Sequence, residues 1–208
     1  MKRLLIIGAG GHGVVVAEAA ADSGLWNEIQ FLDDDIAADS VPSFPIVGRV
    51  DEFNALADDD TGIIVAIGDN RVRLALSSDI ASSGCHLATV VHPTACISSS
   101  ASISPGAVVC AGAIINARAK LGRASILNTG ATVDHDCDIA AGAHISPGAN
   151  LAGNVTVGEC AWIGIGSAVR EGVHIGRDVI AGAGSAIISD VGDGETVGGV
   201  PAKRLVKQ

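Results

Sequence analysis

The chain has 208 residues, enough for one or two domains, and 48% of them are hydrophobic, so a core can form. Only 2% are aromatic and the formal net charge is −10 at pH 7, which argues against a nucleic-acid-binding protein. The charge is uneven, because residues 1–95 carry 5 Lys/Arg against 14 Asp/Glu whereas residues 96–208 carry 8 against 9. Lys203, Arg204 and Lys207 lie in the tail, where an anionic ligand is best tolerated.

Cysteine usage and the N-terminus bear on metals and location. The five cysteines have neither the spacing of a disulfide framework nor a CxxC pair, so we expect no metal site. Met1-Lys2-Arg3 followed by four apolar residues resembles a signal peptide, but the glycines at 8–13 interrupt that run. We therefore predict a cytoplasmic protein with no membrane partner.

The N-terminal third reads as a nucleotide-binding unit. Residues 4–7 predict a buried strand, and GAGGHG at 8–13 leads from it into an apolar helix that runs to about Ser23. A second strand ends at 29–32, before Asp33-Asp34-Asp35. The glycines would let the backbone approach a pyrophosphate at the start of the helix. This pattern predicts the first βαβ unit of a Rossmann-like domain.

A third strand at 63–67 leads through Gly68-Asp69-Asn70 into a helix that carries Arg71 and Arg73. The region up to residue 91 is too short for a full dinucleotide fold, which argues against NAD and for one mononucleotide half. The alternative is a packing domain whose glycines only tighten a turn. His92-Pro93 marks a boundary, so we predict a domain at 1–91 and a hinge at 92–96.

A six-residue repeat dominates the rest of the chain. Three hexads predict one triangular coil of three short strands, in which residues 18 apart stack. We therefore predict a parallel β-helix domain over 97–192 and a tail over 193–208, although the repeat alone does not give the hand of the coil. Fifteen of the sixteen positions of the repeat hold Ile, Leu or Val: Ile97, Ile103, Val109, Ile115, Leu121, Leu127, Val133, Ile139, Ile145, Leu151, Val157, Ile163, Val169, Ile175, Ala181 and Ile187.

One turn of the repeat carries a titratable base, since His135 lies between Asp134 and Asp136. A carboxylate can select the tautomer of a neighbouring imidazole, which suits a general base. Gly153 follows 18 residues later, so its N–H is predicted one coil above, where it could stabilise an oxyanion. His144 is expected on a neighbouring face or edge. The alternative is a solvated surface histidine, and the residues alone do not decide between the two.

The whole chain resembles the bacterial hexapeptide-repeat acyltransferases that modify sugars. It is most similar to the group containing the UDP-4-amino-sugar N-acetyltransferases of the bacillosamine type, which has sialic-acid O-acetyltransferases as relatives. The motifs cover both predicted domains and the tail, and they are more specific for the family than for the acceptor. They are GAGGHG at 8–13, FLDD at 31–34, AIGDNRVR at 66–73, ILNTGATVDHDC at 126–137, GAHISPGANLAGNV at 142–155 and GGVPAKRL at 198–205.

The resemblance implies a left-handed β-helix after the Rossmann-like domain and a homotrimer with active sites between neighbouring subunits. It also implies acetyl-CoA along a groove of the β-helix and a nucleotide sugar on the N-terminal domain. By matching positions, His135 becomes the general base, with Asp136 beside it where relatives can carry Glu. Asn128 joins these catalytic residues.

The remaining site residues follow from the same matching. Gly153 is implied as the backbone donor to the acetyl carbonyl. Ile165 and Ala183 are implied as backbone contacts of the coenzyme, whose phosphates Lys203 and Arg204 could approach. The residues implied for the nucleotide-sugar side are Gly10, His12, Asp33, Asp34, Asn70, Arg73 and His144.

These observations predict an acetyl-CoA-dependent N-acetyltransferase acting on the 4-amino group of a nucleotide-linked amino-deoxy sugar. No metal is expected, because the thioester is already activated. The first alternative is an O-acetyltransferase for sialic acid or another sugar hydroxyl. The second is a non-catalytic scaffold that binds nucleotide sugars, which a lack of CoA binding would favour. The sequence does not distinguish UDP, dTDP and GDP.

Overall fold

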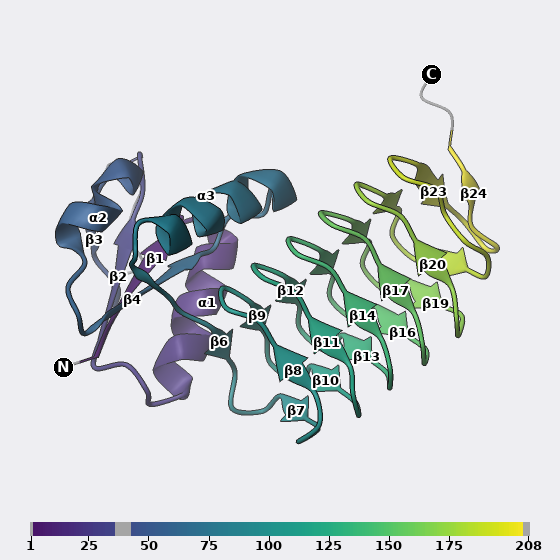
Figure 1. Cartoon of the computed structure of the whole chain (residues 1–208), viewed down its shortest axis with the longest axis horizontal. Helices are drawn as coiled ribbons and strands as arrows, with labels where there is room; N and C mark the ends of the chain where they lie inside the picture. Colours follow the sequence, from purple (N-terminus) through teal and green to yellow (C-terminus); the bar gives the residue numbers. More distant parts are fainter. Residues whose placement is uncertain (1, 36–42, 206–208) are drawn as a thin grey trace.

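A computed structural model of the chain describes residues 2–35 and 43–205. An α/β part lies at one end of a long triangular β-helix, and the C-terminal tail lies at the other end (Figure 1). The predicted site residues are divided between these two parts and the tail.

The α/β part is a parallel sheet with the strand order β3-β2-β1-β4-β5, which matches the first five strands of the doubly wound nucleotide-binding sheet. The predicted strands correspond to β1, β2 and β4, whereas the short edge strands β3 and β5 lacked a sequence signal. The strands are β1 (Arg3–Ile7), β2 (Glu28–Leu32), β3 (Ile46–Gly48), β4 (Thr61–Val65) and β5 (His86–Leu87). The helices are α1 (Gly11–Asp22), η1 (Val50–Glu52), α2 (Phe53–Leu56) and α3 (Asn70–Ser82).

The glycine-rich turn brings α1 close to the end of β1. A Cβ atom on Gly13 would lie 2.0 Å from the backbone oxygen of Gly8, so only glycine allows the helix to start this close to the strand. Gly8 itself has φ +102°, in the left-handed region that favours glycine. The turn therefore brings the start of α1 to the carboxyl edge of the sheet.

Three sheets form the faces of the β-helix, and their strands run parallel except for the last, β24. The six-stranded face holds β7 (Cys96–Ile97), β10 (Ile114–Ile115), β13 (Thr132–Val133), β16 (Asn150–Leu151), β19 (Ala168–Val169) and β22 (Ala186–Ile187). The five-stranded face holds β8 (Ser102–Ile103), β11 (Lys120–Leu121), β14 (Asp138–Ile139), β17 (Thr156–Val157) and β20 (His174–Ile175). The eight-stranded face holds β6 (Val90–Val91), β9 (Val108–Val109), β12 (Ile126–Leu127), β15 (His144–Ile145), β18 (Trp162–Ile163), β21 (Ile180–Ala181), β23 (Thr196–Gly198) and β24 (Lys203–Arg204).

The predicted 18-residue spacing between stacked residues is confirmed over most of the β-helix. Ile115 pairs with Val133 and Val133 with Leu151, and the aliphatic rows of all three faces join in one core. Burying each of these side chains stabilises the fold by roughly 1.5–3 kcal/mol, and the side chains become buried only when the coils stack.

Both ends of the repeat differ from the prediction. Val91 already pairs with Val109, so the stacking begins one hexad before Ile97. At the other end Val191 bridges to Ile175, and Ala181 pairs with Val197, both 16 residues apart. The expectation that regular hexads continue to Gly192 is therefore wrong for the last one, because that coil is two residues shorter. The predicted division into residues 1–91, 92–96, 97–192 and 193–208 stays a prediction.

The α/β part covers only one end of the eight-stranded face. Val16 and Ala20 of α1 share a core cluster with Val108 and Ile126 of β9 and β12. Further along the same face, Trp162 of β18 and Ile180 of β21 are 39% and 51% exposed. This face therefore leaves an open apolar surface directly beside the α/β part.

Candidate active site

His135 lies in the turn between β13 and β14, with an acid on each side. Its ring nitrogen Nδ1 is 2.8 Å from Oδ2 of Asp136, and its backbone N–H donates to Oδ1 of Asp134 at 2.7 Å. The imidazole is 55% exposed, so it is open to a substrate. Because Nδ1 faces the carboxylate, Nε2 is left to take a proton from a reacting group.

Two neighbours control the charge of this turn. Hydrogen bonds from Arg118, and then from His135, hold the pKa of Asp136 far below its usual range. The backbone N–H of His135 is the main cause of the lowered pKa of Asp134, followed by the amide of Asn116. Both carboxylates are therefore ionised at neutral pH, as the pairing with an imidazole requires.

Gly153 lies directly above the imidazole, as the 18-residue spacing predicts. A Cβ atom at this position would lie 2.6 Å from both Cε1 and Nε2 of His135. The coils are joined here by the N–H of Asn154, which donates to the oxygen of His135 at 2.8 Å, while Gly153 N–H has no hydrogen-bond partner among the described residues. A free N–H beside a base is the arrangement that an oxyanion needs.

A second histidine cluster lies where the α/β part meets the β-helix. The rings of His12 and His144 are 6.5 Å apart, and His144 lies 5.0 Å from the ring of Trp162. Asn128 approaches Nε2 of His144 through its amide nitrogen at 3.0 Å. The structure thus brings together three predicted site residues, together with a tryptophan that the sequence did not single out.

Burial keeps both histidines of this cluster neutral. Desolvation, aided by the charge of Arg73, lowers the pKa of His12 to about 4 and that of His144 to about 3. Nε2 of His12 and Nδ1 of His144 are buried without a hydrogen-bond partner among the described residues. Since such atoms are costly when left unpaired, they favour a bound polar ligand or water at this place.

An apolar groove of about 540 Å³ runs from this cluster along the eight-stranded face. His144 and Trp162 line one end, and Ile165 and Ala183 line its edge. Ile165 and Ala183 occupy equivalent turn positions, 18 residues apart, where Gly184 N–H donates to the oxygen of Ile165 at 2.8 Å. Lys203 is exposed on β24, which extends the same face.

The glycine turn and the first two acids of 33–35 form the other predicted half of the site. Gly10 caps α1 without a side-chain hydrogen bond, and no atom of the described residues lies within 4 Å of a Cβ atom built on it. Asp33 supports this turn, because its carboxylate accepts from Ala9 N–H at 2.7 Å and from Asp35 N–H at 2.9 Å. Asp34 is exposed and lies 3.7 Å from Arg49.

Asn70 and Arg73 are placed differently from the other predicted nucleotide-side residues. Arg73 is fully buried and donates to the backbone oxygens of Ala124 and Gly142 in the β-helix, both within 2.8 Å. Asn70 accepts from Arg73 and donates to the oxygen of Cys160 at 2.9 Å. These side chains therefore join the α/β part to the β-helix, and their role on the nucleotide side stays a prediction.

Within one chain, His135 and the groove residues Ile165 and Ala183 lie on different edges of the triangle. His135 and Gly153 are in turns that follow strands β13 and β16 of the six-stranded face, whereas Ile165 follows β18 of the eight-stranded face. One chain thus presents two separate half-sites. Sequence reasoning missed Trp162 and Arg118, because an aromatic residue on a strand and a surface arginine carry no signal of their own.

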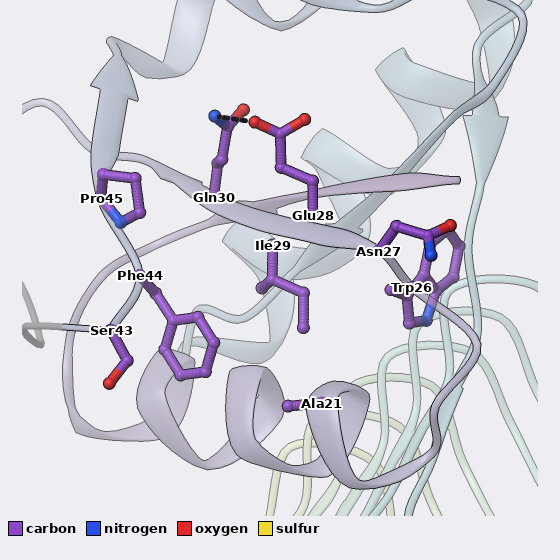
Figure 2. A pocket seen from close by; sticks show the side chains of 9 residues that line it. All are labelled: Ala21, Trp26, Asn27, Glu28, Ile29, Gln30, Ser43, Phe44 and Pro45. Atoms are coloured by element: carbon purple, nitrogen blue, oxygen red, sulfur yellow. Dashed lines mark hydrogen bonds between the residues drawn. The ribbon is translucent and has the colours of Figure 1, made fainter. Parts of the chain in front are cut away.

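A further hollow of about 410 Å³ lies between the end of α1 and strand β2. Figure 2 shows Trp26 and Phe44 on either side of Ile29, with Glu28 and Gln30 bonded to each other on β2. None of the predicted site residues is among its described lining residues. We therefore place the candidate site at the two half-sites.

The described part of the chain contains neither a metal-binding cluster nor a membrane-spanning helix. Residues 2–35 and 43–205 contain no group of three or more His, Cys, Asp or Glu that could hold a metal ion. Likewise, no helix in these ranges is long and apolar enough to span a bilayer.

A β-helix that carries an exposed imidazole beside a free N–H on one edge, and that follows a Rossmann-like domain, fits an acyltransferase of the left-handed β-helix class. Known proteins agree with this class. The sequence model of the PglD N-terminal domain matches residues 3–80. The acetyltransferase domain of PglB from Neisseria gonorrhoeae, solved with acetyl coenzyme A, is 46% identical over 98% of this chain and 99% of that one, with a TM-score of 0.95.

Two further solved structures extend the comparison. PerB from Caulobacter crescentus, solved with CoA and GDP-perosamine, is 39% identical over 99% of this chain and 98% of that chain, with a TM-score of 0.93. WeeI from Acinetobacter baumannii is 26% identical over 99% of this chain and all of its own, with a TM-score of 0.88. The chain belongs to the hexapeptide-repeat sugar N-acyltransferase family, and the predicted fold, including its left-handed β-helix, is confirmed.

Proposed function

We propose that this enzyme transfers an acetyl group from acetyl-CoA to the 4-amino group of a nucleotide-linked amino-deoxy sugar. The observation that carries the proposal is the imidazole of His135, bonded to Asp136 and lying under Gly153. Relatives that are 46% and 39% identical were solved with acetyl-CoA and with CoA plus GDP-perosamine, which supports both co-substrates. We also propose a cytoplasmic location.

The reaction needs one base and one oxyanion donor. The neutral amine nitrogen attacks the thioester carbonyl and forms the new C–N bond, while Nε2 of His135 takes a proton from that nitrogen. The carbonyl oxygen becomes an oxyanion that Gly153 N–H stabilises. The C–S bond then breaks, and the proton held by His135 passes to the departing sulfur, which leaves as the CoA thiol.

The two co-substrates would occupy the surfaces described above. The pantetheine arm fits the apolar groove at Ile165 and Ala183, with Lys203 near the phosphates of the coenzyme. The nucleotide would lie at Gly10 and Asp34, where the start of α1 has no side-chain cap and favours negative charge. The acceptor sugar would then lie beside the cluster of His12 and His144, at the end of the groove.

We further propose a homotrimer in which each active site forms between two subunits. The two half-sites lie on different edges of one β-helix. In a cyclic trimer, one edge of each copy faces a different edge of the next, so the half-sites would meet three times. This arrangement would bring His135 of one subunit to the groove of its neighbour.

Replacing His135 by Ala tests the base. Transfer at neutral pH should fall about 10²-fold or more. The matched control is His174→Ala, because His174 is also an exposed β-helix histidine bonded to a neighbour, Thr156 at 2.6 Å. UDP-, dTDP- and GDP-linked 4-amino sugars are offered beside free and CMP-linked sialic acid. Activity of His135→Ala within a few-fold of the parent would remove it as the base, and product only from sialic acid would favour O-acetylation.

A further inference from the structure

Arg118 lies one coil below Asp136 and binds its carboxylate with two hydrogen bonds. Nε donates to Oδ1 at 2.6 Å and a terminal guanidinium nitrogen donates to Oδ2 at 2.7 Å. The same Oδ2 faces Nδ1 of His135 at 2.8 Å. Arg118, Asp136 and His135 therefore form one continuous chain of contacts that ends at the reacting nitrogen.

The backbone holds this chain of contacts in register. Arg118 and Asp136 both have left-handed backbone angles, with φ of 61° and 60°, which residues other than glycine rarely adopt. They occupy the same turn position in consecutive coils, and Asp136 N–H donates to the oxygen of Ala117 at 3.0 Å. The 18-residue stacking thus places a guanidinium opposite a carboxylate across the turn.

The two carboxylates beside His135 have different hydrogen-bond partners. Asp134 is occupied by the backbone N–H of His135 at 2.7 Å and by the amide of Asn116 at 2.8 Å. Above the ring, Gly153 brings no side chain. Arg118 is therefore the cation that meets Asp136 from the neighbouring coil, and Asp136 is the carboxylate that meets the ring.

We propose that Arg118 is a positioning residue, which holds Asp136 against Nδ1 so that His135 keeps its proton there and leaves Nε2 free. This rests on the proposed function of His135 as the base. A short, exposed aspartate bonded only to the imidazole could rotate away, whereas a two-point guanidinium bond fixes both carboxylate oxygens. The orientation of the carboxylate in turn selects the tautomer of the ring.

The test compares Arg118→Gln and Arg118→Lys with the parent enzyme. Arg118→Gln should lower kcat roughly tenfold, the order expected when a base loses part of its orientation, with little change in either KM. Arg118→Lys should recover part of kcat, since one charged donor remains. At alkaline pH, ring-nitrogen NMR shifts of His135 should report the Nδ1–H tautomer in the parent and a mixture in Arg118→Gln.

Arg177→Gln is the matched control. Arg177 also reaches an aspartate on a neighbouring coil with two nitrogens, at 3.3 and 3.2 Å from Asp193, but among the described residues no histidine ring is hydrogen-bonded to that pair. It should change neither kcat nor the His135 tautomer. The inference is overturned if Arg118→Gln keeps both the parental kcat and the parental tautomer. The NMR measurement needs no turnover, so it decides the role of Arg118 even where the parent fails to transfer acetyl and the proposed function falls.

Discussion

Gly153 is the residue that the repeat places directly above the imidazole of His135. Turn positions of the β-helix accept many side chains, but here a Cβ atom would lie 2.6 Å from the imidazole of His135. The glycine is not required by a left-handed backbone angle, since Gly153 is not among the residues with positive φ. Its lack of a side chain therefore leaves room for the imidazole below it and keeps the N–H accessible.

Gly153→Ala should leave the fold intact and lower kcat at least about tenfold, because the methyl group pushes the imidazole out of its position for proton transfer. Thermal unfolding and steady-state kinetics measure the two effects separately. Gly192→Ala is the control, since a Cβ atom there meets Glu195 at an ordinary 3.6 Å. An unchanged kcat for Gly153→Ala would show that His135 does not work in the observed position.

Helix α3 is the element that fixes the α/β part on the β-helix. Arg73 on this helix is fully buried and donates to Ile67, Ala124 and Gly142 backbone oxygens, and burial lowers its pKa to about 10. Its charge also contributes to the lowered pKa values of His12 and His144. One side chain thus joins the two parts and helps to keep the histidine cluster neutral.

Arg73→Met should lower the free energy of unfolding by roughly 2–4 kcal/mol, because several buried carbonyl oxygens lose their donor. Arg71→Met on the same helix is the control; it removes only an exposed ion pair with Asp178 and should cost less than about 1 kcal/mol. Urea unfolding measures both variants. Equal stabilities for the two would contradict the role of Arg73 as the link between the parts.

The strands of the β-helix were predictable from their strict periodicity, and β1, β2 and β4 from their apolar runs, whereas the short edge strands β3 and β5 were not. The hexads determine which residues stack, so Gly153 could be placed above His135 from spacing alone. The shortened last coil could not be predicted from the spacing, because Val191 fits either the predicted small-residue row or an inward position. Arg73 matched a nucleotide-side motif, yet all but one of its partners are backbone oxygens, which no side-chain pattern reveals. Trp162 likewise acquires its place beside His144 only when β15 and β18 pair.

At the scale of the whole molecule, two of the three edges of the β-helix carry different candidate site residues. The edge after the six-stranded face carries His135 and Gly153, and the edge after the eight-stranded face carries Ile165 and Ala183 beside the groove. In one chain these two sets of residues lie on different edges of the triangle. The proposed trimer follows from this separation, and it makes the activity of mixed assemblies predictable.

His135→Ala and Ile165→Glu should each abolish transfer, the second because an exposed apolar side chain of the groove becomes anionic where the anionic coenzyme would lie. Mixed trimers from equal amounts of both should regain about a quarter of the parental activity, because one interface in four then combines two intact edges. Co-expression with two affinity tags, followed by light scattering and an acetyl-transfer assay, measures this. A mixture of His135→Ala with His135→Gln is the control and should stay inactive, since both variants lack the imidazole on the same edge. If the His135→Ala and Ile165→Glu mixture also stays inactive, both edges serve one subunit and the proposed inter-subunit site is wrong.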